Sequence, residues 1–331
     1  MISRRQFTML SASSTLATGL AMANVTTAHA EGMPKAIRII VGFPPGGSVD
    51  AVARLIADEM KEFVSSVSVE NRPGAGGRIA LDALKSARAD GSVIVLTPGD
   101  QITLFPYIFR KLSYDPRMDF LPVLTACTVQ FLLTVGSAVP RRVVTLADFI
   151  AWCKDNPRLA NYGTPGIGTR QHFIGMALAK AAEMEFVHVP YPGAPAAIQD
   201  LLAGQIAANI SVIANALPHI RSGAVRALMT TAPGRGVSLA DVPTANEIGF
   251  PALETVEWFG IFLPSATPVD TASALRSVMS TALQTERFKD NLARLSLDQA
   301  TTPPTDMAGL IKADMDRSLR IVRASGFSPL E

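Results

Sequence analysis

The stretch IIVGFPPGGSVDAVARLIADEM, residues 39–60, joins an apolar segment to an amphipathic one through Pro-Pro-Gly-Gly. The apolar segment predicts a buried strand, and the spacing of apolar residues beyond Ser48 predicts a helix over 48–63. The two glycines allow a sharp turn, and the two prolines stiffen it. Because the joint leaves the first N–H groups of the helix exposed, it is consistent with two roles: a plain strand-to-helix connection, or a loop that binds an anionic or polar ligand.

Strand-like and helical segments alternate along most of the chain, which predicts an α/β fold with mainly parallel sheets covered on both faces. The expected strands are IRIIVGF, VSVEN, VIVLT, FLPVLTA, FLLTVGS, NYGT, FVHVPY, QIAANIS, RALMTT and VEWFGIFLP. The expected helices span 48–63, 79–87, 145–156, 169–183, 195–203, 216–223, 269–283, 286–295 and 305–324. The helix that starts at Thr145 opens with T-L-A-D, which resembles a capping box.

The chain is expected to form two lobes, because a second α/β succession follows the first and VEWFGIFLP can return the chain to the first lobe. We expect residues 31–130 and 255–331 in one lobe and residues 131–254 in the other. The second lobe has its own glycine-rich joint, YGTPGIGTRQH, between a strand and a helix. If both joints face one cleft, their helix N-termini form opposing jaws for a small anionic or polar ligand.

Neither glycine-rich joint has the features of a nucleotide site. The second lacks the Gly-Lys-Ser/Thr that a phosphate-binding P-loop requires. A third glycine cluster, residues 74–77, follows Arg-Pro, which interrupts the junction that a dinucleotide fingerprint needs. No cofactor is therefore expected.

The first 30 residues have the pattern of an export signal: a basic start, a weakly apolar middle and Ala28-His29-Ala30 as the cleavage site. The mature chain is expected to begin at Glu31 and to be soluble in the periplasm. Arg4 and Arg5 favour the twin-arginine route, with an ordinary Sec signal as the alternative. Their removal takes the formal charge of the 331-residue chain from +2 to zero, so its basic pI does not argue for nucleic-acid binding.

Groups that could carry catalysis are few. Cys127 and Cys153 are the only cysteines, and separate buried thiols are favoured over a disulfide. No histidine pair has metal-ligand spacing, so no metal is expected, and no G-x-S-x-G motif is present. An exported enzyme that uses His172 with Asp100 or Asp200 remains a competing hypothesis.

Nine blocks in order resemble the substrate-binding proteins of the tripartite tricarboxylate transporters, the Bug or TctC-like family. The blocks are VGFPPGGSVDAVARL, VENRPGAGG, ADG, LSYDPRMDFLPV, NYGTPGIGT, HVPYPGAPAAIQDLLAGQI, VRALMTT, DVPTANEIGFP and WFGIFLPSATP. The resemblance implies a two-lobed type II periplasmic-binding-protein fold that closes over a solute. It also implies a monomer that delivers a small organic acid, amino acid or amide to membrane permease subunits, without chemistry of its own. A partner that presents ligand to a membrane histidine kinase is the alternative.

The resemblance also implies a set of ligand-binding residues. They are Phe43, Pro45, Gly46, Gly47, Ser48, Gly163, Thr164, Gly166, Gly168, Thr169, His172, Tyr191, Ala194 and Pro195, with Asp200 in support. The chain departs from the family at Asp100 and Arg170, where small or hydroxyl residues are usual. If both charges face the cleft, Asp100 favours a cationic or amide end of the ligand and Arg170 an acidic end, which together suit an amino-acid-like solute.

Overall fold

The computed structural model describes residues 33–331. The expected export signal, its cleavage site and Glu31 lie outside the described residues. Within the described part, no helix combines the length and the apolar character that a membrane span requires.

The elements follow the expected order closely. The strands are β1 (Ala36–Val41), β2 (Ser66–Asn71), β3 (Val93–Pro98), β4 (Phe120–Val135), β5 (Asn161–Thr164), β6 (Val187–Pro190), β7 (Ala208–Val212), β8 (Arg226–Thr230), β9 (Val256–Pro264) and β10 (Asp298–Gln299). The helices are α1 (Ser48–Met60), α2 (Arg78–Lys85), α3 (Asp100–Thr103), α4 (Phe105–Ile108), α5 (Leu146–Asp155), α6 (Arg170–Ala182), α7 (Ala194–Leu202), α8 (Ile213–Arg221), α9 (Val269–Ala282), α10 (Glu286–Arg294) and α11 (Met307–Ser325). The predicted capping box of α5 is confirmed, with Thr145 and Asp148 bonded reciprocally.

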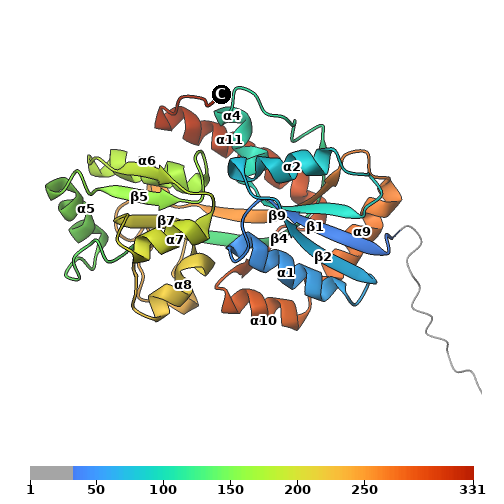
Figure 1. Ribbon diagram of the computed structural model, residues 1–331, viewed down its shortest axis with the longest axis horizontal. Helices are drawn as coiled ribbons and strands as arrows, with labels where there is room; N and C mark the ends of the chain where they lie inside the picture. Colours follow the sequence, from blue (N-terminus) through green and yellow to red (C-terminus); the bar gives the residue numbers. More distant parts are fainter. Residues whose placement is uncertain (1–32) are drawn as a thin grey trace, which may run out of the picture. The chain divides into compact units, whose positions relative to one another are not determined.

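One mixed sheet in the order β2-β1-β3-β9-β4-β7-β5-β6 organises the fold. Pairing is parallel at both ends, where β1 lies between β2 and β3 and where β5 lies between β6 and β7. The central strands β4 and β9 pair antiparallel with their neighbours. Figure 1 shows α5, α6, α7 and α8 around β5 and β7, and α1, α2, α9 and α10 around β1, β2 and β9.

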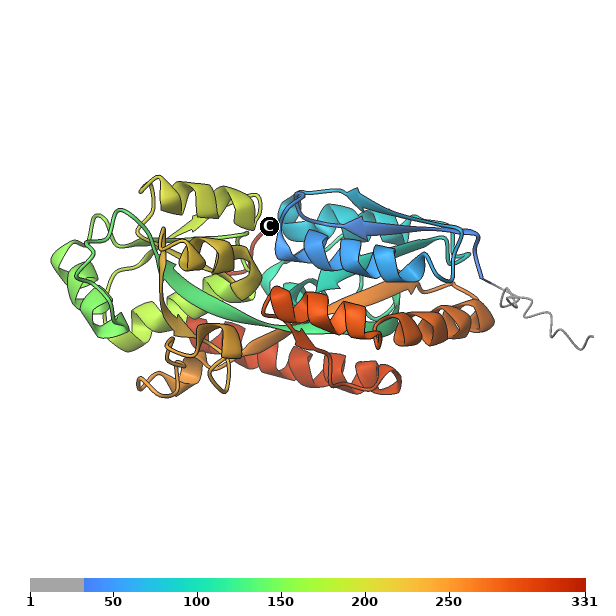
Figure 2. The same cartoon turned by 90° about the horizontal axis from the view of Figure 1, so that it is seen from below.

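The segments FLPVLTA and FLLTVGS, which we expected as two strands, form the single strand β4 of 16 residues. Its first part pairs with β9 as far as Gln130, and from Phe131 onward it pairs with β7 and β8. Figure 2 shows green β4 passing from the side of the blue helix α1 to the side of α5 to α8. One continuous strand therefore belongs to both parts of the sheet.

The sheet is apolar on both faces because helices cover both. In β1, Ile39 and Val41 join the large core beneath α1, α9 and α10, while Ile40 joins a second cluster beneath α2 and α11. The same alternation occurs in β9, where Phe259 and Trp258 belong to different clusters. This two-sided burial explains the near-continuous apolar runs of the strand sequences.

Cys127 in β4 and Cys153 in α5 are both buried and free, which confirms the favoured prediction of two separate thiols. Burial raises the pKa of the Cys153 thiol to about 12, and it also raises the pKa of Cys127. Both side chains are therefore protonated core residues at neutral pH.

Replacement of Phe131 by Ala tests the place where β4 changes partners. The Phe131 ring is fully buried, so Phe131→Ala should lower the free energy of unfolding by about 3–5 kcal/mol through lost burial and a residual cavity. Urea unfolding followed by circular dichroism measures this loss. The control is Phe63→Ala, because Phe63 is 37% exposed; equal losses for the two variants would contradict the assignment of Phe131 to the core.

Candidate ligand-binding pocket

Strand ends and helix starts converge on one pocket. α1 follows β1, α3 follows β3, α6 follows β5, α7 follows β6 and α8 follows β7, so several helix N-termini lie at the carboxyl ends of parallel strands. The pocket is lined by Phe43, Gly47, Ser48, Val49, Pro98, Asp100, Gln101, Pro165, Thr169, Gln171, Ala194, Pro195, Val212, Asn215, Glu257 and Phe259. Its volume is about 40 Å³, enough for one or a few water molecules.

The Pro-Pro-Gly-Gly joint is held by polar contacts. Gly46 has a φ of +84°, in the left-handed region that favours glycine. Its N–H donates to Oδ2 of Asp50 at 3.0 Å, and Asn71 donates through Nδ2 to both the Phe43 carbonyl and Asp50 Oδ1. Arg54 completes the cluster by pairing with Asp50. Burial acts against the charge of Asp50, but the hydrogen bonds from Arg54, Gly46 and Asn71 lower its pKa overall.

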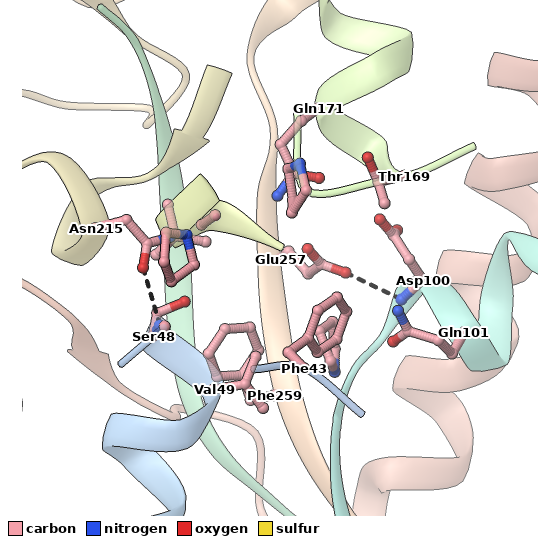
Figure 3. Close-up of a pocket in the computed structure, with 16 residues that line it drawn as sticks. Phe43, Ser48, Val49, Asp100, Gln101, Thr169, Gln171, Asn215, Glu257 and Phe259 are labelled. Carbon is pink, nitrogen blue, oxygen red and sulfur yellow. Dashed lines mark hydrogen bonds between the residues drawn. The ribbon is translucent and has the colours of Figure 1, made fainter. Parts of the chain in front are cut away.

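The N-terminus of α1 faces the opposite wall of the pocket. The Ser48 N–H donates to Oδ1 of Asn215, at the start of α8, over 2.9 Å, and Figure 3 shows this contact at the edge of the pocket. Among the described residues, no acceptor is bonded to the N–H groups of Val49 or Asp50. These first-turn donors and the helix dipole together favour a negative group at this end of the pocket.

The second joint differs from our expectation, because a side chain of the protein already occupies the N-terminus of α6. The Arg170 N–H donates to Oδ2 of Asp100 at 2.6 Å. Arg170 Nε donates to Oδ1 of the same carboxylate at 3.1 Å, and Nη2 forms an ion pair with this oxygen at 2.9 Å. Asp100 lines the pocket, but both of its oxygens are engaged by Arg170. The two charges therefore neutralise each other and do not face a ligand separately.

Asp314 of α11 completes this buried cluster. Its Oδ2 accepts from Arg170 Nη2 at 3.1 Å and from the Thr103 hydroxyl at 2.9 Å. Arg170 is 2% exposed; burial alone would lower its pKa, but Asp100 and Asp314 raise it. Arg170 thus ties α6 to α3 and α11 and does not line the pocket.

His172 lies outside the pocket lining. Its Nδ1 accepts the Gly168 N–H at 3.2 Å, and its ring stacks on His188 with centroids 3.8 Å apart. Burial lowers the pKa of His172 to about 4, while burial and the neighbouring His172 lower that of His188 to about 3. Asp100 is bonded to Arg170, and Asp200 accepts from the Tyr191 hydroxyl at 2.7 Å. The structure therefore forms neither histidine–aspartate pair that the enzyme hypothesis needed.

The predicted ligand-binding residues fall into three groups. Those in the pocket lining are Phe43, Gly47, Ser48, Asp100, Thr169, Ala194 and Pro195. Those at an adjacent cavity between the 74–77 loop and the 165–167 loop are Gly166 and Tyr191, with Phe43 shared by both cavities. Those outside both linings are Pro45, Gly46, Gly163, Thr164, Gly168, Arg170, His172 and Asp200.

Several lining residues were not predicted from the sequence. They are Val49, Pro98, Gln101, Pro165, Gln171, Val212, Asn215, Glu257 and Phe259. One signal was available for Glu257, since a carboxyl group within the apolar run VEWFGIFLP is unusual in a strand buried on both faces. Among the described lining residues, the charged side chains are Asp100 and Glu257, and none is basic. No group of described His, Cys, Asp and Glu residues could hold a metal ion.

A mixed sheet in two parts, with helix N-termini directed at one pocket between strand ends, defines a two-lobed type II periplasmic binding protein. The predicted fold class is confirmed by BugD, described as a periplasmic binding protein. It is 26% identical to this chain, has a TM-score of 0.84, and the match covers 89% of this chain and 99% of BugD. The chain belongs to the TctC family, the tripartite tricarboxylate transporter family receptors, which it matches over residues 52–327. This confirms the resemblance found in the sequence.

Two similar proteins of Rhodopseudomonas palustris have structures with organic acids. One is described with adipate; it is 28% identical, with a TM-score of 0.84, and the match covers 89% of this chain and 98% of that protein. The other is MatC with bound malate; it is 28% identical, with a TM-score of 0.80, and the match covers 87% of this chain and 98% of MatC.

Removal of the buried guanidinium should destabilise the protein strongly. Arg170→Met leaves the carboxylates of Asp100 and Asp314 without their cation, so the free energy of unfolding at neutral pH should fall by about 3–5 kcal/mol. The loss should shrink as the pH falls, because burial raises the pKa of Asp100 and protonation then neutralises this unpaired carboxyl group. Chemical denaturation at several pH values measures it.

The matched control is Lys289→Met, which removes an exposed ion pair with Glu286 and should cost at most about 0.5 kcal/mol. A loss for Arg170→Met as small as that of the control would contradict the buried-cluster assignment.

His172 and His188 should remain neutral in the folded protein well below the ordinary histidine range. Their lowered pKa values mean that the unfolded chain takes up protons near pH ~6.5 while the folded chain does not. Stability should therefore decline as pH falls from ~6.5 toward ~4. NMR of the imidazole C–H signals checks this: in the folded protein both should stay unshifted down to pH ~5.5, and in urea both should titrate. A midpoint near pH ~6.5 in the folded state for either ring would refute the prediction.

Proposed function

We propose that the protein captures a small carboxylate-bearing organic solute in this pocket and delivers it to the membrane subunits of a tripartite tricarboxylate transporter. The observation that carries the proposal is the N-terminus of α1: Ser48 and Val49 line the pocket, and no acceptor among the described residues is bonded to the N–H groups of Val49 and Asp50. Adipate and malate in the similar proteins support a carboxylate as the group bound there. Each helix terminus typically contributes about 0.3–1 kcal/mol to binding an anion, so several contacts are needed.

We infer that binding proceeds by closure of two lobes, residues 31–130 with 255–331 against residues 131–254. The pocket draws Ser48 and Phe43 from the first set and Asn215 and Thr169 from the second, so a solute can contact both sets at once only when they are together. A ligand that makes contacts only in the closed state shifts the population toward it. The exchange of the Ser48–Asn215 hydrogen bond for solute contacts is part of this step.

The remaining parts of the proposal concern setting and partners. The protein acts as a monomer in the periplasm, exported by a twin-arginine or Sec signal, without cofactor and without catalysing a reaction. The structure supports the last point, because Nδ1 of His172 accepts the Gly168 N–H and the ring lies outside the pocket lining. The permease subunits recognise the closed form.

A thermal-shift screen with native mass spectrometry tests solute capture. Malate, adipate, citrate and acidic amino acids serve as probes, and one present at a hundred times its dissociation constant should stabilise the protein by about 2.7 kcal/mol. If no carboxylate stabilises the protein while turnover of some substrate is detected, the proposal is wrong.

The variant Asn215→Asp tests whether the carboxylate binds at the start of α1. Its Oδ1 can still accept from the Ser48 N–H, but its negative charge lies beside the bound carboxylate. We expect at least about tenfold weaker binding of whichever carboxylate the wild type binds, measured by calorimetry, with the unfolding transition preserved. Asn291→Asp on α10, outside the pocket, is the control and should bind as the wild type does. Equal affinity of the two variants would place the carboxylate elsewhere.

A further inference from the structure

Glu257 is a pocket group that the carboxylate contacts above do not use. It lies on β9, is 2% exposed, and shares the pocket wall with Phe259 two residues further along the strand. Residues two apart in a strand point to the same face, so the strand directs this carboxyl group and the Phe259 ring into the same space. Figure 3 shows Glu257 in the centre of the pocket view.

Only one oxygen of Glu257 is engaged by the protein. Oε1 accepts the Asp100 N–H at 3.0 Å. No hydrogen bond from a described residue reaches Oε2, which Figure 3 shows turned away from Asp100. A carboxylate oxygen of a largely buried side chain is costly to leave without a donor unless a proton or a partner in the pocket satisfies it. Oε2 is therefore available to accept a hydrogen bond from a molecule bound in the pocket.

The charges around Glu257 do not balance within the protein. The charged groups that act on Glu257 are Asp100 on α3, Arg170 on α6 and Asp314 on α11. Arg170 pairs with Asp100 and Asp314, and Glu257 accepts from the Asp100 N–H, so this cluster holds one guanidinium and three carboxyl groups, and full ionisation leaves two negative charges in excess. Burial, and then the Asp100 charge, raise the pKa of Glu257 well above its ordinary value. A cationic group at Oε2 would offset part of this excess.

The pocket thus offers two different ends. At the start of α1 it presents N–H donors to a carboxylate, and at Oε2 of Glu257 it presents an acceptor in a region of excess negative charge. A dicarboxylate without an amino group places a second negative charge near Glu257. Its binding therefore requires the uptake of a proton by this pair of carboxyl groups. An ammonium group donates to Oε2 and is attracted by the surrounding carboxyls.

We propose that the pocket selects solutes that carry an ammonium group as well as a carboxylate, with the ammonium against Glu257 Oε2 and the carboxylate at the N-terminus of α1. This rests on the proposed function and names the class of solute. Glu257 is then the residue that distinguishes an amino acid from the organic acid of the same carbon skeleton.

Isothermal titration calorimetry with matched pairs tests this assignment. L-Aspartate and succinate differ only by the amino group, and so do L-glutamate and glutarate. The wild type should bind at least one of the amino acids about tenfold or more tightly than its matched diacid at pH ~7.5. Binding should release protons and strengthen as the pH rises from ~6 to ~8, because the ammonium favours ionised Glu257. Buffers of different ionisation enthalpy report the proton release.

Two variants identify the group responsible. In Glu257→Gln, Oε1 can still accept the Asp100 N–H, but the charge is lost; the preference for the amino acid should fall below about threefold and the pH dependence should disappear. Glu254→Gln removes an exposed carboxylate outside the pocket and should keep both properties. An unchanged preference in Glu257→Gln would overturn the proposal.

The wild-type measurements decide the matter even if Glu257→Gln folds poorly. If the diacid binds as well as or better than the amino acid, takes up protons and weakens with rising pH, then Glu257 acts as a protonated donor to a carboxylate. In that case this inference fails while solute capture stands. If neither members of the pairs nor the other carboxylates bind, both proposals fail together.

Discussion

Burying the guanidinium of Arg170 is the constraint on which the arrangement of the site depends. A cation taken out of water must have charged partners close by, and here they come from α3 and α11, which are far from Arg170 in sequence. The backbone N–H of the same residue also bonds to Asp100. The side chain and the backbone of Arg170 therefore both hold α6 against α3. These two contacts fix the spacing of the helices around the pocket between α1, α3 and α6.

This constraint also makes the two glycine-rich joints unequal. Both end in a helix whose first turn is directed at the carboxyl ends of strands, and the sequence suggested equivalent jaws. At α6 the Asp100 carboxylate already takes the role of an anion, whereas the N–H groups of the second and third residues of α1 bond to no acceptor in the described part of the chain. Glu257 sits between these two ends with one oxygen committed to the Asp100 N–H. The chemistry of the pocket is consequently polarised, with donors on one side and acceptors on the other.

Local patterns determined what could be read from the sequence. Strand and helix periods, the Thr145 capping box and the two glycine joints depend on neighbours within a few residues, so these features were predicted closely. The single strand β4 was missed because its change of partners at Gln130 and Phe131 is decided by β7, β8 and β9. The Arg170–Asp100 pair and the pocket positions of Glu257 and Asn215 were missed for the same reason. Their partners lie 70 to 167 residues away, and no spacing rule connects them.

The uninterrupted course of β4 beside β9 has a mechanical consequence. The two strands are hydrogen-bonded to each other from Phe120 to Gln130, so they behave as a twisted ribbon. The register irregularities after Pro122 and Thr125 add local twist to this ribbon. The lobe closure that we propose must therefore twist this ribbon, and the cost of that twist is spread over many backbone dihedrals. The stiffness of the paired strands β4 and β9 then opposes closure in either direction, together with the contacts of the pocket.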